Sequence, residues 1–151
     1  MLNIEQILAK PVDINPLTIY KYGRVESRIH LLFVKSFPCS IHQHGEHCNG
    51  QGSPIDPDHL MLQGGRGTSF KESDEWTLPL CRIHHNEKTI CGNEREFWQR
   101  WDMSYEEAEE ICISKALLSP APVIVERMIM NLQARGFSNP EILNMRLPVW
   151  L

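Results

Sequence analysis

Two adjacent histidines stand among the residues of this sequence that could do chemistry. They lie in the stretch PLCRIHHNEK, residues 79–88, which also contains Cys81 a few positions before them. Residues three apart on a helix share one face, so Cys81 and His84 can bind the same ion. His85 then lies about 100° further around the helix and faces a different neighbour. The spacing therefore predicts a separate task for each histidine.

A closed set of four residues is the predicted zinc site. Two further cysteines lie in a loop rich in proline and glycine, which is long enough to fold back onto the Cys-x-x-His pair. Three thiolates and one imidazole form a tetrahedral site of the structural kind, with no open position for a substrate. This argues against a zinc hydrolase at the cluster. The candidate ligands are Cys39, Cys48, Cys81 and His84.

Three histidines of the same loop are alternative zinc ligands: His42, His44 and His47. Cys39 and His42 would form a CxxH pair of their own, and Cys48 would then not be a zinc ligand. Thiolates compete better than imidazoles for zinc where both can reach it, so we favour Cys48. The three histidines are then solvated loop residues.

A second group of candidate residues begins with Asp58 and His59 in the stretch IDPDHLML. One carboxylate and two imidazoles suit a hard divalent cation together with a general base. We expect Asp58 and His85 to hold Mg2+ or Mn2+, and His59 to deprotonate a water. Neighbours on a regular strand point to opposite faces. Asp58 and His59 can therefore share a site only at a strand end or an irregularity, which Pro57 would allow.

Hydrophobic periodicity places these residues on an α+β scaffold. RVESRIHLLFVKSF has a helical period that Pro38 ends, and short strands are expected around HLML and in EWTLPL. CRIHHNEKTI is typical of a helix ended by Gly92. The first segment of the chain, to about Tyr22, is expected to form a short helix followed by an irregular arm.

The C-terminal third is predicted to be entirely helical. NEREFWQRW is followed by SYEEAEEICISKALL, whose Ser104 and Glu107 form a capping-box pattern. VIVERMIMNLQARG and SNPEILNM come next, the latter with Ser138 or Asn139 as its cap and Pro140 in its first turn. The Met, Ile and Leu stripe of these helices is expected to pack in the core, with a partner-binding face as the alternative.

Length and composition are those of one globular domain. Of the 151 residues, 42% are hydrophobic and 23% charged. The sequence has no apolar run of about eighteen residues and no start typical of an export signal, so we expect a cytoplasmic protein. Five cysteines then indicate a metal site, with Cys91 and Cys112 as buried free thiols. A net charge of -4 and a pI near 6.0 argue against general electrostatic affinity for DNA.

The order of these motifs resembles that of the HNH endonucleases. DPDHL, GGRGTSF and LPLCRIHHNEK, with the preceding HLLFVKSFPC, are most similar to phage and prophage HNH proteins of the recombination-associated Ref type. The similarity covers roughly residues 29–101. It implies a β-hairpin and a helix around one catalytic metal. In that arrangement His59 is the general base, and Asp58 and His85 are the metal ligands.

We expect an α+β chain in three parts, of which the resemblance covers the middle one. Residues 1–28 form an N-terminal arm and the start of a helix. Residues 29–101 form a zinc-stabilised ββα-metal core, and residues 102–151 a helical extension packed on it. LQGGRGTSFK would connect the hairpin, with Arg66 and Lys71 available for phosphate contacts.

Two positions depart from the family pattern. The middle Asn of the family is expected near Trp76, where this sequence has none. Three nearby residues are candidates to replace it: Asp74, Glu75 and Thr77. Many members also have a histidine one turn after the position of His85, which is Thr89 here. Water and phosphate oxygens would then complete the coordination of the metal.

The resemblance implies a DNA endonuclease with structural Zn2+ and catalytic Mg2+ or Mn2+, acting in phage or prophage recombination or DNA processing. The alternative is a catalytically degenerate, zinc-stabilised module that binds nucleic acid or a recombination protein. The missing Asn favours the module. The presence of Asp58, His59 and His85 together favours the enzyme.

Overall fold

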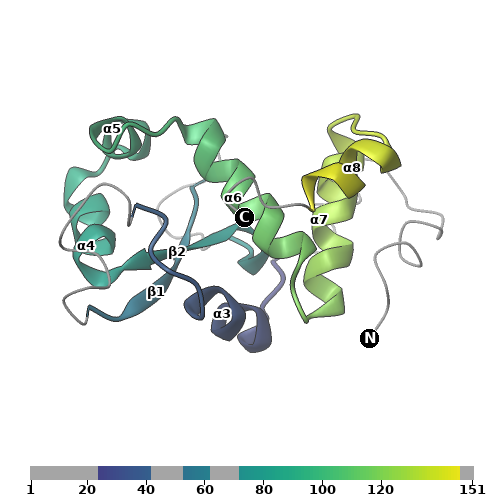
Figure 1. The fold of residues 1–151 in the computed structure, drawn as a ribbon, viewed down its shortest axis with the longest axis horizontal. Coiled ribbons are helices and arrows are strands. Elements are labelled where there is room, and N and C mark those ends of the chain that lie inside the picture. The colour runs from purple at the N-terminus through teal and green to yellow at the C-terminus, as the bar shows by residue number, and fades with distance from the viewer. Residues whose placement is uncertain (1–23, 42–52, 62–71, 147–151) are drawn as a thin grey trace.

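The computed structural model describes residues 24–41, 53–61 and 72–146, and the statements below concern these residues (Figure 1). Two strands and mostly helices make this part of the chain an α+β structure, as predicted. The elements are α3 (Arg28–Lys35), β1 (Ile55–His59), the short 3-10 helix η2 (Asp74–Trp76), β2 (Thr77–Cys81), α4 (Arg82–Cys91), α5 (Glu94–Arg100), α6 (Tyr105–Leu117), α7 (Pro122–Ala134) and α8 (Asn139–Met145). The predicted N-terminal helix and arm lie outside the described residues.

The two strands form an antiparallel hairpin in which Asp58 faces Leu78 and Pro57 faces Pro79. The first strand was expected around HLML. It instead spans Ile55–His59 and so begins upstream of that stretch. Proline is tolerated there because alternate residue pairs of an antiparallel ladder exchange no hydrogen bonds, so two facing prolines leave the ladder intact. The Leu60 N–H continues the pairing with a 2.8 Å bond to the Trp76 carbonyl.

Local signals account for where the helices begin and end. Helix α4 ends at Gly92, whose φ of 69° is favourable for glycine. The predicted capping box at the start of α6 is formed by Ser104 and Glu107. Of the two candidate caps for α8, Ser138 is the one that accepts a backbone hydrogen bond, and Asn139 is the first helical residue.

Helix α3 is shorter than its periodic sequence because Ser27 caps it. The residues before the cap lie against the start of η2. The Val25 N–H donates to the Ser73 hydroxyl (2.6 Å), and the Ser27 N–H donates to an Asp74 carboxylate oxygen (2.8 Å). These contacts hold the start of α3 beside the hairpin.

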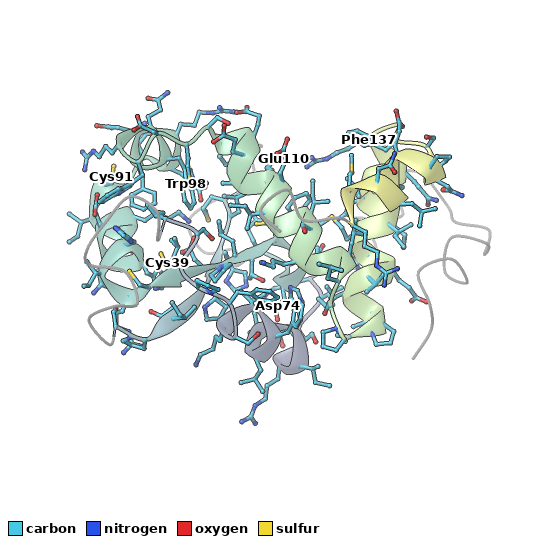
Figure 2. All side chains as sticks on the ribbon, viewed as in Figure 1. Cys39, Asp74, Cys91, Trp98, Glu110 and Phe137 are labelled. Carbon is cyan, nitrogen blue, oxygen red and sulfur yellow. The ribbon has the colours of Figure 1, made fainter. Side chains whose placement is uncertain are left out.

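Helix α6 joins the two ends of the molecule, since it contacts both β2 and α7 (Figure 1). One hydrophobic core extends from Leu78 and Leu80 of β2 to the apolar face of α7 and to Ile142 of α8. The Met, Ile and Leu stripe is therefore core packing, as predicted. Cys112 is fully buried, whereas Cys91, labelled in Figure 2, is only partly buried, contrary to the expectation. Cys91 is the last residue of α4.

No helix within the three described ranges is long and apolar enough to cross a lipid bilayer.

We expect Met128→Ala to lower the free energy of unfolding by about 2–5 kcal/mol, because the side chain is fully buried and its removal leaves a cavity. Chemical denaturation measures the change. Val123→Ala on the same helix is the matched control, since Val123 is half exposed and should cost far less. Equal losses in the two variants would contradict the position of α7 in the core.

Candidate functional site

Three of the four predicted zinc ligands converge in the structure. The sulfurs of Cys39 and Cys81 lie 3.5 Å and 3.2 Å from the same nitrogen, Nδ1 of His84. All three residues are buried, and their ligand atoms lie within 4.8 Å of one another. Two thiolates and an imidazole are zinc ligands, so this group can hold a metal ion such as zinc. Cys48 and the alternatives His42, His44 and His47 lie outside the described residues.

Each ligand of this cluster comes from a different local structure. Cys39 follows α3 in a turn that is fastened to β2, because both the N–H and the hydroxyl of Ser40 donate to the Pro79 carbonyl (2.9 and 2.8 Å). Cys81 ends β2 and also caps α4. His84 lies in the first turn of α4, and the ring of Trp101 packs edge-on against it at 4.5 Å. The cluster therefore joins the loop after α3 to the junction of β2 and α4.

The second predicted pair, Asp58 and His85, also meets in the structure. Oδ1 of Asp58 lies 3.3 Å from Nε2 of His85. The other ring nitrogen, Nδ1, lies 3.2 Å from an oxygen of Asp56. Asp56 and Asp58 are two apart on β1, so strand alternation puts both carboxylates on the face toward α4. His85 is therefore held between two carboxylates.

Asp56 is a site residue that the sequence analysis missed. Arg82 donates to both of its oxygens (2.8 and 3.2 Å), and this hydrogen bonding, followed by the contact with His85, lowers the pKa of the Asp56 carboxyl. A carboxylate on one ring nitrogen of a metal-binding histidine orients the other nitrogen toward the metal. The spacing of the two aspartates in IDPDH is the signal that could have identified it.

The second oxygen of Asp58 lies against a buried lysine, Lys88, at 2.5 Å. The same ammonium lies 2.6 Å from Glu94 and 3.1 Å from the His59 carbonyl. Burial by itself lowers the pKa of Lys88, but Asp58 and Glu94 outweigh it and raise that pKa above its ordinary value. Neither Lys88 nor Glu94 was predicted, since no short motif links them to Asp58.

The predicted general base, His59, lies on the opposite side of β1 from Asp58, as strand alternation requires. Its Nε2 is 2.8 Å from Oδ1 of Asp74, which is nearly fully buried. The structure therefore brings together Asp58 and His85, and separately His59 and Asp74. The ring of His59 makes its hydrogen-bond contact with Asp74 and not with Asp58.

The structure distinguishes the three candidates for the missing Asn. Asp74 contacts the His59 ring, whereas the Glu75 carboxylate accepts from Asn131 of α7 (3.2 Å). Thr77 donates to the Asp74 carbonyl (2.8 Å). The Thr89 hydroxyl donates to the His85 carbonyl within α4. Arg66 and Lys71 lie outside the described residues.

A buried histidine, His30, lies behind the Asp74 contact. Its Nδ1 is 2.8 Å from the Ser119 hydroxyl. Burial lowers the pKa of His30 to about 4, with Asp74 opposing and His59 adding to the shift. The His30 ring is therefore neutral near pH 7 and does not compete as a cation for the Asp74 carboxylate.

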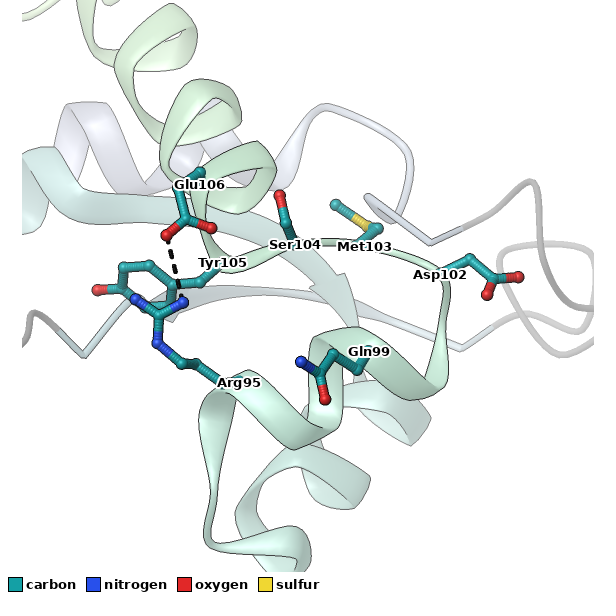
Figure 3. A pocket seen from close by; sticks show the side chains of 7 residues that line it. All are labelled: Arg95, Gln99, Asp102, Met103, Ser104, Tyr105 and Glu106. Carbon is teal, nitrogen blue, oxygen red and sulfur yellow. Dashed lines mark hydrogen bonds and ion pairs between the residues drawn. The ribbon is translucent and has the colours of Figure 1, made fainter.

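A surface pocket of about 300 Å3 lies elsewhere, between α5 and the start of α6 (Figure 3). An ion pair between Arg95 and Glu106 (3.2 Å) crosses it, and the Arg95 guanidinium also covers the Tyr105 ring. The pocket contains none of the predicted site residues. The candidate site is instead formed by the hairpin and α4.

Comparison with known proteins identifies a family for most of the chain. The family described as "Protein of unknown function (DUF968)" matches residues 5–113. The "Uncharacterized protein YdfU" of Escherichia coli (strain K12) is 42% identical over 55 residues, which are 36% of this chain and 14% of that relative. The match thus spans a small part of the relative's length. No solved structure matches the chain.

We expect purified protein to contain about one zinc ion per chain, and Cys81→Ser to lose it, with a lower melting temperature. Serine is a good helix cap, so the loss would reflect the ion and not the capping role of Cys81. Metal analysis by mass spectrometry and thermal unfolding measure the two effects.

Cys91→Ser is the matched control, because Cys91 is also on α4 but is not in the cluster. It should keep both the zinc and the melting temperature. Full zinc content in Cys81→Ser would contradict the predicted site.

Proposed function

The chain belongs to the DUF968 family of proteins of unknown function, and we propose that it is a metal-dependent DNA endonuclease of the HNH type. The observation that carries the proposal is the 3.3 Å approach of Asp58 Oδ1 to His85 Nε2 between the hairpin and α4. The hairpin leads directly into this helix, an order that supports a ββα-metal core. The donors, one carboxylate oxygen and one imidazole nitrogen, suit Mg2+ or Mn2+.

The residues around His85 support its role as a metal ligand. Asp56 holds Nδ1, which leaves Nε2 directed at Asp58. One residue earlier, His84 is fixed by the cysteines, so the direction of His85 on α4 is fixed as well. When bound, the cation would stabilise the negative charge that develops on the phosphate.

His59 is the proposed general base. Asp74 can only accept a hydrogen bond when it is ionised, so Nε2 of His59 carries the proton in their 2.8 Å contact. Nδ1 is then the nitrogen that takes a proton from the attacking water. The buried Asp74 carboxylate keeps the ring in this orientation and stabilises the imidazolium that forms, as the carboxylate does in other carboxylate–histidine pairs.

The proposed structural Zn2+ takes no part in the chemistry. Cys39, Cys81 and His84 would supply three of its ligands, and Cys48 remains the proposed fourth. The task of this group is to hold α4 against the hairpin. The proposal of a phage or prophage setting, and of DNA recombination or processing in the cytoplasm of a bacterial host, rests on the Ref-type resemblance.

A DNA- or protein-binding module without activity is the second candidate function. One observation favours it: the Lys88 ammonium lies 2.5 Å from Asp58 and adds a positive charge beside a carboxylate that must hold a cation. Such a module would bind nucleic acid or a recombination protein and leave DNA intact.

We expect the purified protein to nick plasmid or single-stranded DNA with Mg2+ or Mn2+ and to be inactive in EDTA. His59→Ala should lower the rate by about 10²–10⁴-fold because the general base is lost, and His85→Ala should abolish cleavage by removing a metal ligand. Gel assays of plasmid nicking measure both.

Thr89→Ala is the control on the same helix and should cleave at the wild-type rate, since among the described residues its hydroxyl bonds within α4. Cleavage by His59→Ala as fast as by wild type would refute the assignment of the base. DNA binding by the wild type without cleavage under any of these conditions would favour the binding module.

Asp74 should behave as a positioning residue for His59. We expect Asp74→Ala to slow cleavage by at least about tenfold, and Asp74→Asn to retain more of the rate because its amide oxygen can still accept from Nε2. Cleavage rates at saturating metal, together with melting temperatures, measure the difference.

Ser73→Ala is the matched control for Asp74. It removes the neighbouring contact with Val25 but not the contact with His59. If Ser73→Ala and Asp74→Ala slow cleavage equally, the role of Asp74 is to hold the start of α3 and not to orient the base.

A further inference from the structure

Lys88 links the metal-binding helix to the end of β1. It is three residues after His85, so both side chains lie on the face of α4 toward the hairpin. Its Nζ lies 2.5 Å from Oδ2 of Asp58 and 3.1 Å from the His59 carbonyl oxygen. One ammonium group thereby fixes the side chain of the metal ligand and the backbone of the general base.

This ammonium is enclosed by protein oxygens. It donates hydrogen bonds to Asp58 and to the His59 carbonyl, and it forms an ion pair with Glu94 at 2.6 Å. Its side chain is only 9% exposed. Lys88 is therefore not available to bind a phosphate of the substrate, unlike an exposed lysine.

The contact with Lys88 also determines which oxygen of Asp58 is available to bind a cation. Oδ2 is held by the ammonium, whereas Oδ1 faces Nε2 of His85. Glu94, whose other oxygen accepts from the Met61 N–H (2.8 Å), holds Lys88 from the far side. The carboxylates of buried Asp58 and partly buried Glu94 would repel each other without the cation between them.

We propose that Lys88 is a positioning residue that restricts Asp58 to one metal-binding oxygen and holds it in register with His59. This inference rests on the proposed nuclease function. The restriction weakens divalent-cation binding, since an ammonium competes for Asp58, but it leaves coordination positions for water and phosphate. Removing the ammonium should therefore tighten cation binding and slow cleavage, whereas simple damage to the site would weaken both.

The test compares Mn2+ binding, measured by electron paramagnetic resonance, with DNA cleavage at saturating Mn2+. We expect Lys88→Met to bind Mn2+ about tenfold more tightly and to cleave about tenfold more slowly than wild type. Lys88→Met/Glu94→Gln should change in the same directions. This second variant keeps the net charge of the site and removes the repulsion between the two carboxylates, so it can fold if the single variant does not.

Lys35→Met, on the exposed surface of α3, is the control for loss of one lysine and should match wild type in both measurements. Unchanged or weaker Mn2+ binding in both Lys88 variants would overturn the inference. Cleavage by both variants at the wild-type rate would also overturn it. If the wild type binds Mn2+ but cuts no DNA, the proposed function fails and the Mn2+ measurements alone decide the role of Lys88.

Discussion

The convergence of two cysteine sulfurs on one ring nitrogen of His84 is the constraint on which the rest of the site depends. Cys39 comes from the loop after α3, Cys81 from the end of β2 and His84 from the first turn of α4. A two-stranded hairpin is at best marginally stable alone, so it needs such a junction and the helices that cover it. Fixing His84 also fixes the direction of the next residue, because neighbours on a helix are separated by about 100°.

Strand alternation then divides the candidate site between the two faces of β1. Asp58 and Asp56 face α4, where they hold the two nitrogens of His85, while His59 faces η2 and the buried Asp74. His85 has a carboxylate on each ring nitrogen and His59 has one on Nε2, and these contacts fix the orientations of the two rings. The burial of Asp58 and Glu94 requires a compensating charge, and Lys88 supplies it.

The predictable part of the fold is the part governed by neighbours in sequence. The capping serines, Gly92 and the apolar period give α4, α6 and α8 almost to the residue, and the i, i+3 spacing gives the pairing of Cys81 with His84. The first strand begins earlier than the HLML pattern predicts, because Pro57 faces another proline and the ladder passes through it. The division of the chain into an arm, a core and an extension stays a prediction.

The sequence by itself determined the residue types of the site and their local spacing: the Cys-x-x-His-His helix, the Asp-His pair and the helical C-terminal third. Only the tertiary structure decided the partners, because these come from residues distant along the chain. Asp74 reaches His59, Lys88 reaches Asp58, and Ser40 fastens the cysteine loop to β2. No periodicity or short motif encodes such contacts. They arise because buried charges and backbone groups must find partners once the hairpin is packed between helices.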